Sequence, residues 1–296
     1  MKRIGVLGTC QVSAIGDALF HMLDPSEVVV FQVVEVEQSN RHAQVENILA
    51  DCDMVFSHFL PDRFGPLSTV NLRRRIKNLA TLPALLFTGF HPDCVYLQHG
   101  EILHKSPMQD HNSAIVAASY SLGLPVERTE RLFNKFVFQK LGYFDEFAQA
   151  RAYVTKIMDN LGLDIAAEWP DWMRYGAFMH TINHPRAYVL ASIAKMAAVK
   201  AGLVPVGTPT PDLPGDVLGQ LPIWPVYPEI AEALGIKGRY IFRKSGSPDA
   251  AAGEHNLLSL KDFIQGSYDF YARFPPEVFE IETSAKVRAV LSTLLT

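Results

Sequence analysis

The start of the chain limits most strongly what this sequence can fold into. Residues Arg3–Gln11 read Arg-Ile-Gly-Val-Leu-Gly-Thr-Cys-Gln. Ile4–Leu7 is a short apolar run, typical of a buried parallel strand, and Gly8 breaks it. Apolar residues then recur on one helical face: Ile15, Leu19, Phe20 and Leu23. The stretch predicts a strand, a tight turn and a helix.

A cysteine, Cys10, lies in the predicted turn. Open α/β sheets bind ligands at the carboxyl ends of their strands, where this turn is expected. The free N–H groups and partial positive charge of a helix N-terminus favour a thiolate, so we expect one at Cys10. The alternative is a small buried residue that fills a corner, since free cysteine is among the most buried residue types.

Strand and helix patterns alternate up to about residue 95. Three further segments are typical of strands: Glu27–Val36, Asp53–Phe59 and Pro83–Thr88. Arg41–Ala50 and Ser68–Leu79 are predicted helices, with Ser68 as the N-cap of the second. Such alternation implies right-handed crossovers between parallel strands. The predicted fold class is therefore α/β, with a parallel doubly wound sheet in the N-terminal part.

Beyond this part the pattern is mainly helical. The predicted helices are His111–Leu122, Val126–Leu141, Phe144–Leu161, Pro185–Gly202, Ser259–Arg273 and Ser284–Leu295, and 238–244 is a late strand. Hydrophobic residues make up 48% of the 296 residues, enough for a large core. We expect a single domain over residues 1–296, with an α/β core at 1–105 and a mainly helical elaboration at 106–296.

Composition excludes several classes of protein. A net charge of -4 gives no basic field for nucleic acid. The three cysteines form neither a disulfide framework nor a zinc motif, as expected in a reducing compartment. No apolar stretch approaches the ~20 residues that span a membrane, and the first apolar run is too short for a signal peptide. We expect a cytoplasmic protein without a transmembrane segment.

Polar side chains follow three of the predicted strands. They are Thr9-Cys10-Gln11, Ser57-His58 and His91-Pro92-Asp93. Because parallel strands end at one edge of the sheet, a thiol, two imidazoles and a carboxylate are expected at one crevice. A further cluster precedes a predicted helix that has Pro185 at its first position. It consists of His180, Thr181, Asn183 and His184, and would form an anion site at the helix start.

Three of these motifs carry a resemblance to a known family. Gly8-Thr9-Cys10-Gln11, Gly89-Phe90-His91-Pro92-Asp93 and His180-Thr181-Ile182-Asn183-His184-Pro185 resemble, in order and spacing, the WcbI-type polysaccharide biosynthesis family. That family is regarded as acetyltransferases of capsular polysaccharide assembly that bind coenzyme A. The resemblance spans roughly residues 3 to 200. Thr9 departs from it, because the family pattern has Asn there and a Thr hydroxyl is shorter than an amide.

The resemblance implies acyl transfer from acetyl-CoA to a sugar hydroxyl. Either Cys10 is acetylated, with a histidine as base, or the histidine deprotonates the sugar hydroxyl directly. His184 is the first candidate base and His91 the second, with Asp93 orienting an imidazole. Residues expected to contact the cofactor are Gly8, Thr9, Gln11, His58, His180, Thr181 and Asn183. Candidate phosphate ligands are Arg73, Arg74, Arg239, Arg243 and Lys244.

Three alternatives use the same residues differently. With water as acceptor, Cys10 and a histidine would form a thiol hydrolase or esterase. His58, His91, Asp93 and His184 would form a metal site, but their spacing is not compact and we expect no metal. A non-catalytic coenzyme A-binding protein is the third. In the favoured hypothesis the partner is a small-molecule or polysaccharide-precursor sugar.

Overall fold

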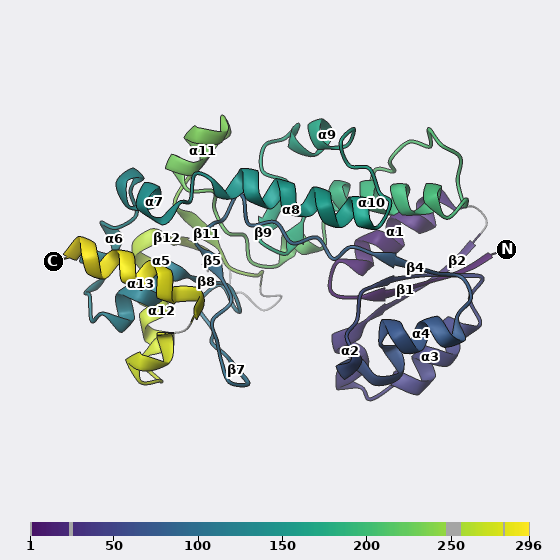
Figure 1. Cartoon of the computed structure of the whole chain (residues 1–296), viewed down its shortest axis with the longest axis horizontal. Helices are drawn as coiled ribbons and strands as arrows, with labels where there is room; N and C mark the ends of the chain where they lie inside the picture. The colour runs from purple at the N-terminus through teal and green to yellow at the C-terminus, as the bar shows by residue number, and fades with distance from the viewer. Residues whose placement is uncertain (1, 24–25, 247–255, 281, 296) are drawn as a thin grey trace. The chain divides into compact units, whose positions relative to one another are not determined.

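The computed structural model describes residues 2–23, 26–246, 256–280 and 282–295 (Figure 1). The chain forms two compact units. Unit 1 comprises Met1–Leu86, Tyr153–Phe178 and Asn183–Leu218, and unit 2 comprises Phe87–Ala152, Met179–Ile182 and Gly219–Thr296. The first boundary between them follows Leu86, whereas the sequence pattern placed the end of the α/β core at residue 105.

Unit 1 is built on a four-stranded parallel sheet of order β2-β1-β3-β4. Its strands are β1 (Lys2–Gly8), β2 (Ser26–Gln32), β3 (Met54–His58) and β4 (Leu79–Leu82). Ile4 in the centre of the sheet pairs with Val28 on one side and Met54 on the other. The predicted α/β class, with a parallel sheet near the N-terminus and many helices, is confirmed.

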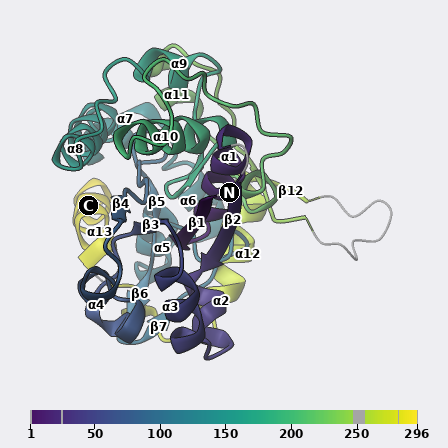
Figure 2. The ribbon, with the colours of Figure 1, turned by 90° about the vertical axis from the view of Figure 1, so that its right-hand side faces the viewer.

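Helices cover both faces of this sheet. α1 (Val12–Met22) and α10 (Ala187–Lys200) lie against each other on one face, and α2 (Val33–Gln38), α3 (His42–Ala50) and α4 (Thr69–Arg75) lie on the other (Figure 2). Apolar side chains of β1, β3 and the second group of helices form one buried cluster that includes Leu7, Val45, Leu49, Val55 and Leu72. The unit also contains the 3₁₀ helix η1 (Asp62–Leu67), α9 (Trp169–Met173), β10 (His184–Pro185) and the C-terminal part of α8 (Glu146–Asn160).

The prediction of a fourth strand at Pro83–Thr88 is wrong. The strand ends one residue before Pro83, and residues 83–88 have no regular structure. Proline has no N–H to donate to a neighbouring strand, so the real strand, β4, ends before Pro83. The apolar pattern had predicted a strand that begins at this residue. His91 and Asp93 consequently do not follow a strand of the sheet, and both belong to unit 2.

Other predicted boundaries change as well. The helix predicted for Ser68–Leu79 ends at Arg75, and Leu79 already belongs to β4. The strand predicted for Glu27–Val36 ends at Gln32, where α2 begins. Val126–Leu141 is two helices instead of one, α6 (Val126–Glu130) and α7 (Lys135–Leu141). Pro185 is not in a helix, because α10 begins at Ala187 with Arg186 as its N-cap. The predicted N-cap Ser68 is confirmed: its hydroxyl accepts a bond from the Asn71 N–H.

Unit 2 is mainly helical with short two-stranded pairs. Its other α-helices are α5 (Ala114–Ser121), α11 (Pro228–Leu234), α12 (Leu260–Tyr271) and α13 (Glu282–Leu295), and α8 (Glu146–Asn160) begins in it. The 3₁₀ helix η3 (Pro276–Phe279) lies within the unit, and η2 (Leu218–Gln220) lies at its boundary. Its strands are β5 (Cys94–Val95), β6 (Gln98–His99), β7 (Ile102–Leu103), β8 (Asn112–Ser113), β9 (Met179–Thr181), β11 (Ile241–Arg243) and β12 (Leu257–Ser259). Aromatic rings form much of its core, with Phe242 stacked on Phe263 at 4.1 Å between ring centroids. None of the helices in the described ranges is long and apolar enough to cross a membrane.

Close packing of α1 on β2 depends on Gly16. A Cβ at this buried position would lie 2.3 Å from Val30 Cγ2. Gly16→Ala is therefore expected to lower the free energy of unfolding by about 1–3 kcal/mol, the usual cost of overpacking. Urea denaturation measures it, with Gly215→Ala as control, because a Cβ at Gly215 meets nothing within 4 Å. Equal stability of the two variants would contradict this account of the packing.

Candidate functional site

The turn after β1 lies where ligands bind in folds of this kind. The chain leaves β1 through Thr9, Cys10 and Gln11, enters α1 and continues to β2 on one side of β1. The neighbour on the other side is β3, whose connection runs in the opposite direction to β4. The carboxyl ends of β1 and β3 thus flank the topological switch point of the sheet, the usual ligand position in open α/β folds. Cys10 and His58 both lie at this position.

The ring of His58 lies directly against the backbone of the turn. The Thr9 N–H donates to His58 Nδ1 at 3.2 Å, and the Thr9 hydroxyl lies 3.3 Å from the same atom. A Cβ on Gly8 would be 2.5 Å from Nδ1, so only glycine permits this approach. Burial lowers the pKa of His58 to about 4. His58 is therefore neutral, and because Nδ1 accepts a bond, its proton is on Nε2.

The thiol of Cys10 is half-buried in this turn. Burial raises its pKa, although the N–H groups of Cys10 and Gln11 and the Thr9 hydroxyl act in the opposite direction. The expectation of a thiolate is thus wrong. Cys10 precedes the N-cap of α1, Gln11, and the cost of burying a charge there exceeds the help that the helix start gives. Burial also raises the pKa of Cys52 and Cys94.

Gln11 holds the turn in place through hydrogen bonds of its buried side-chain amide. Its Oε1 accepts from the Leu85 N–H at 2.9 Å, and its Nε2 donates to the carbonyls of Leu85 at 2.9 Å and Asn183 at 2.8 Å. Both amide hydrogens are thus used within the protein. Gln11 holds Asn183, and with it the next residue, His184, beside the turn. The sequence predicts Gln11 as a cofactor ligand, but its observed contacts are those of a residue that positions the turn.

In unit 2, Asp93 lies at the start of α5. One oxygen, Oδ1, accepts from the Ile115 N–H and the Tyr143 hydroxyl, each at 2.9 Å. The other, Oδ2, accepts from Ser113 at 2.5 Å and Tyr227 at 2.9 Å. Burial raises the pKa of Asp93 to about 6, although these four donors act to lower it. The observed contacts cap a helix and do not support the predicted role of orienting an imidazole.

The histidine of the motif that contains Asp93, His91, is almost completely buried. Burial lowers its pKa to about 4; the carbonyls of Met179 and Pro225 oppose this shift, and His111 and His180 add to it. Within the described parts of the chain, no acceptor lies in good hydrogen-bond geometry with either ring nitrogen of His91, so the two carbonyls act on the ring only as nearby dipoles. His180 and Thr181 are buried in β9. His91 is thus a neutral imidazole without access to solvent.

Sequence reasoning missed the partners of Asp93. Ser113 was recognisable as a helix N-cap, which its hydroxyl fills by accepting from the Val116 N–H. Tyr143 and Tyr227 are 50 and 134 residues from Asp93, and no local pattern marks them. Of the predicted phosphate ligands, Arg73 is bonded to the Thr81 hydroxyl and Arg243 to the Gly219 carbonyl. No group of three or more His, Cys, Asp or Glu side chains suited to a metal ion occurs in the described ranges.

Comparison with known proteins identifies the family. The model of the family described as polysaccharide biosynthesis enzyme WcbI matches residues 3–205, more than half of the chain. The chain belongs to the WcbI family of polysaccharide biosynthesis enzymes. The three motifs that carry the resemblance all lie inside the matched region.

A solved structure of WcbI has the same fold. It is described as the native protein without a disulfide bond between coenzyme A and a cysteine. The TM-score is 0.71 at 16% sequence identity, over 100% of this chain and 99% of that one. The fold likeness thus extends beyond residue 205 to the C-terminal part. No curated protein matches the chain.

The protonation of Asp93 predicts how stability depends on pH. A carboxyl whose pKa rises from 3.8 unfolded to about 6 folded holds its proton more tightly in the native state. Its stabilising effect is complete below about pH 4 and is lost as pH rises through about 6. The difference in unfolding free energy between wild type and Asp93→Asn should therefore fall by up to about 3 kcal/mol from pH 4 to 7. Urea denaturation across this range measures it, and a constant difference would contradict the raised pKa.

Proposed function

We propose that the protein is a coenzyme A-dependent acyltransferase that moves an acetyl group to a sugar hydroxyl in polysaccharide biosynthesis. The observation that carries the proposal is the position of Cys10, half-buried at the switch point beside the bonded pair Thr9–His58. The membership of the family supports the pathway. The WcbI structure, described with reference to a coenzyme A–cysteine disulfide, supports coenzyme A with its sulfur near Cys10.

The reaction is a single acyl transfer. The sugar oxygen attacks the thioester carbonyl and forms a C–O bond, and its proton passes to a base. The C–S bond then breaks, and the departing sulfur takes up a proton to give free coenzyme A. Backbone N–H groups of Cys10 and Gln11, at the start of α1, are the donors for the oxyanion that forms in between.

Direct attack by the sugar fits the site better than an acetylated cysteine. Burial keeps the Cys10 thiol protonated, and only a thiolate is an effective nucleophile. The base in this proposal is His184, because the Gln11 amide holds the adjacent Asn183 beside the turn. His91 is less suited, since its pKa of about 4 makes it a weak base. Cys10 then shapes the pocket for the thioester sulfur.

Oxidised coenzyme A, the symmetrical disulfide, tests the position of the cofactor sulfur. The small ionised fraction of a protein thiol held beside the disulfide attacks one sulfur, forms a mixed disulfide and releases one molecule of coenzyme A. We expect this adduct at Cys10, formed more slowly when acetyl-CoA is bound. Intact mass and peptide mapping identify the modified residue.

Two controls make the labelling decisive. Cys10→Ser should abolish the adduct and Cys52→Ser should leave it unchanged, although both thiols are half-buried. A small reagent, iodoacetamide, should show less preference for Cys10 than the coenzyme disulfide, since the pKa of both thiols is raised. Equal adduct at Cys10 and Cys52 with the coenzyme disulfide would remove Cys10 from the cofactor site.

Mutation separates the two catalytic roles. His184→Ala should lower kcat by roughly 10²–10⁴-fold, the usual contribution of a general base. Cys10→Ala should cost less than about tenfold, whereas loss of a covalent nucleophile costs several powers of ten. Release of coenzyme A from acetyl-CoA, measured with and without a sugar acceptor, gives the rate and separates transfer from hydrolysis.

The matched control for this prediction is His21→Ala, an exposed histidine of the same unit. Its kcat should equal that of the wild type. A Cys10→Ala variant as inactive as His184→Ala would replace direct transfer by a covalent mechanism. Acceptor-independent release of coenzyme A at the full rate would indicate a hydrolase instead.

A further inference from the structure

A pocket of about 510 Å³ lies in unit 2 away from the motif residues. One wall is the loop Lys105–Asp110, a second is Lys244, which follows β11, and a third is Phe270 on α12. None of these residues belongs to the three motifs of the family. The volume is within the range typical of small-molecule sites.

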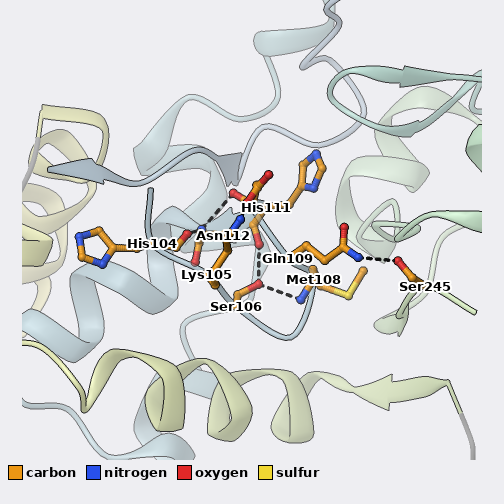
Figure 3. Close-up of polar contacts among 9 residues, drawn as sticks. His104, Lys105, Ser106, Met108, Gln109, His111, Asn112 and Ser245 are labelled. Carbon is orange, nitrogen blue, oxygen red and sulfur yellow. Dashed lines mark hydrogen bonds and ion pairs between the residues drawn. The ribbon is translucent and has the colours of Figure 1, made fainter. Parts of the chain in front are cut away.

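The loop wall is a turn fixed by Ser106. The backbones of Ser106 and Gln109 exchange two hydrogen bonds, at 2.8 and 3.0 Å. The Ser106 hydroxyl accepts from the Met108 N–H at 2.9 Å and donates to the His111 carbonyl at 2.5 Å (Figure 3). Met108 is fully buried and anchors the turn. The turn holds Gln109 at φ 60°, a conformation that few residues other than glycine adopt.

Contacts between the loop and the other two walls fix the shape of the pocket. Pro107 packs against Gly266 of α12, where a Cβ would lie 2.7 Å from Pro107 Cγ. Phe270 is one helical turn further on the same face of α12. On the opposite side, Gln109 Nε2 donates to Ser245 Oγ at 2.9 Å, which fixes the segment that carries Lys244 (Figure 3). Loop, helix and strand end are thus joined around the pocket.

The lining combines positive charge with an apolar ring. Lys105 is paired with Asp110, but in the described part of the chain Lys244 has no ion-pair partner. Phe270 is half-buried, and the guanidinium of Arg273 lies 5.1 Å from its ring centroid. Gln109, which is exposed, brings an amide group to the lining. Such a surface fits a ligand with an anionic group for Lys244 and a flat, partly apolar face for Phe270.

From this lining we propose that the pocket binds the phosphate-bearing ring of a phosphorylated sugar. The phosphate pairs with Lys244, one face of the ring packs on Phe270, and the Gln109 amide bonds to ring hydroxyls. That this sugar is the acetyl acceptor rests on the proposed function. The same chemistry occurs in the phosphorylated ribose of coenzyme A, so the test includes both sources.

Calorimetric titration tests the pocket with two probes. Glucose 1-phosphate represents an acceptor sugar, and adenosine 3′,5′-bisphosphate represents the phosphorylated ribose of coenzyme A. We expect Lys244→Glu to weaken the binding of one of them by about tenfold or more, as for loss of a charged hydrogen bond. The matched control is Lys237→Glu, the same charge change at an exposed lysine of unit 2 outside the pocket, which should bind as the wild type does.

A second variant tests the apolar wall. Phe270→Ala should weaken the binding of the affected probe but not that of inorganic phosphate, which has no ring. Thermal unfolding of each variant confirms that it is folded. Selective loss of glucose 1-phosphate assigns the pocket to the acceptor, and selective loss of the bisphosphate assigns it to the cofactor.

Three results would overturn the proposal: no binding of either probe to the wild type, no effect of Lys244→Glu, or an equal effect of Lys237→Glu. Each is distinguishable from failure of the proposed function. Labelling of Cys10 by oxidised coenzyme A is measured on the wild type and reports only the position of the cofactor sulfur, so its success alongside any of the three would leave the cofactor site standing without this pocket.

Discussion

The arrangement of the switch point depends on one buried amide, that of Gln11. Its three hydrogen bonds join the turn after β1 to Leu85 and to Asn183, segments that are 74 and 172 residues away in the chain. Loss of this amide would leave three backbone groups without their partner: the Leu85 N–H, the Leu85 carbonyl and the Asn183 carbonyl. The same bonds therefore stabilise unit 1 and decide which residues lie beside Cys10.

Asp93 plays a corresponding part in unit 2. A buried carboxyl is costly unless donors surround it, and here three hydroxyls and one N–H do so at the start of α5. The donors come from β8, α5 and two distant tyrosines, so the carboxyl joins segments that are far apart in sequence. Gln11 and Asp93, which belong to two of the motifs, thus hold backbone segments in place. Fewer polar residues of the motifs are therefore available for chemistry.

The competition between burial and local dipoles decides the chemistry at the turn. Cys10 receives help from nearby N–H groups, yet its pKa is raised because the thiol is half-buried. For His58 burial acts alone, and a neutral ring that accepts a bond from Thr9 is the result. In the proposed function, these neutral groups at a helix start suit the binding of an uncharged thioester sulfur better than they suit covalent attack. The Thr9 hydroxyl, where the family pattern has Asn, touches His58 and is part of this balance.

The sequence by itself determined the α/β class, the first and third strands, the cap at Ser68 and the motifs that place the chain in its family. These features are local: an apolar run, a glycine that ends it and a hydroxyl before a helix are visible within a few residues. Tertiary structure alone decided that β4 ends before Pro83, that Tyr143 and Tyr227 surround Asp93, and that the Cys10 thiol is protonated. Each of these depends on burial or on partners that are distant in the chain. Desolvation of a group depends on everything packed around it, which no short segment of sequence specifies.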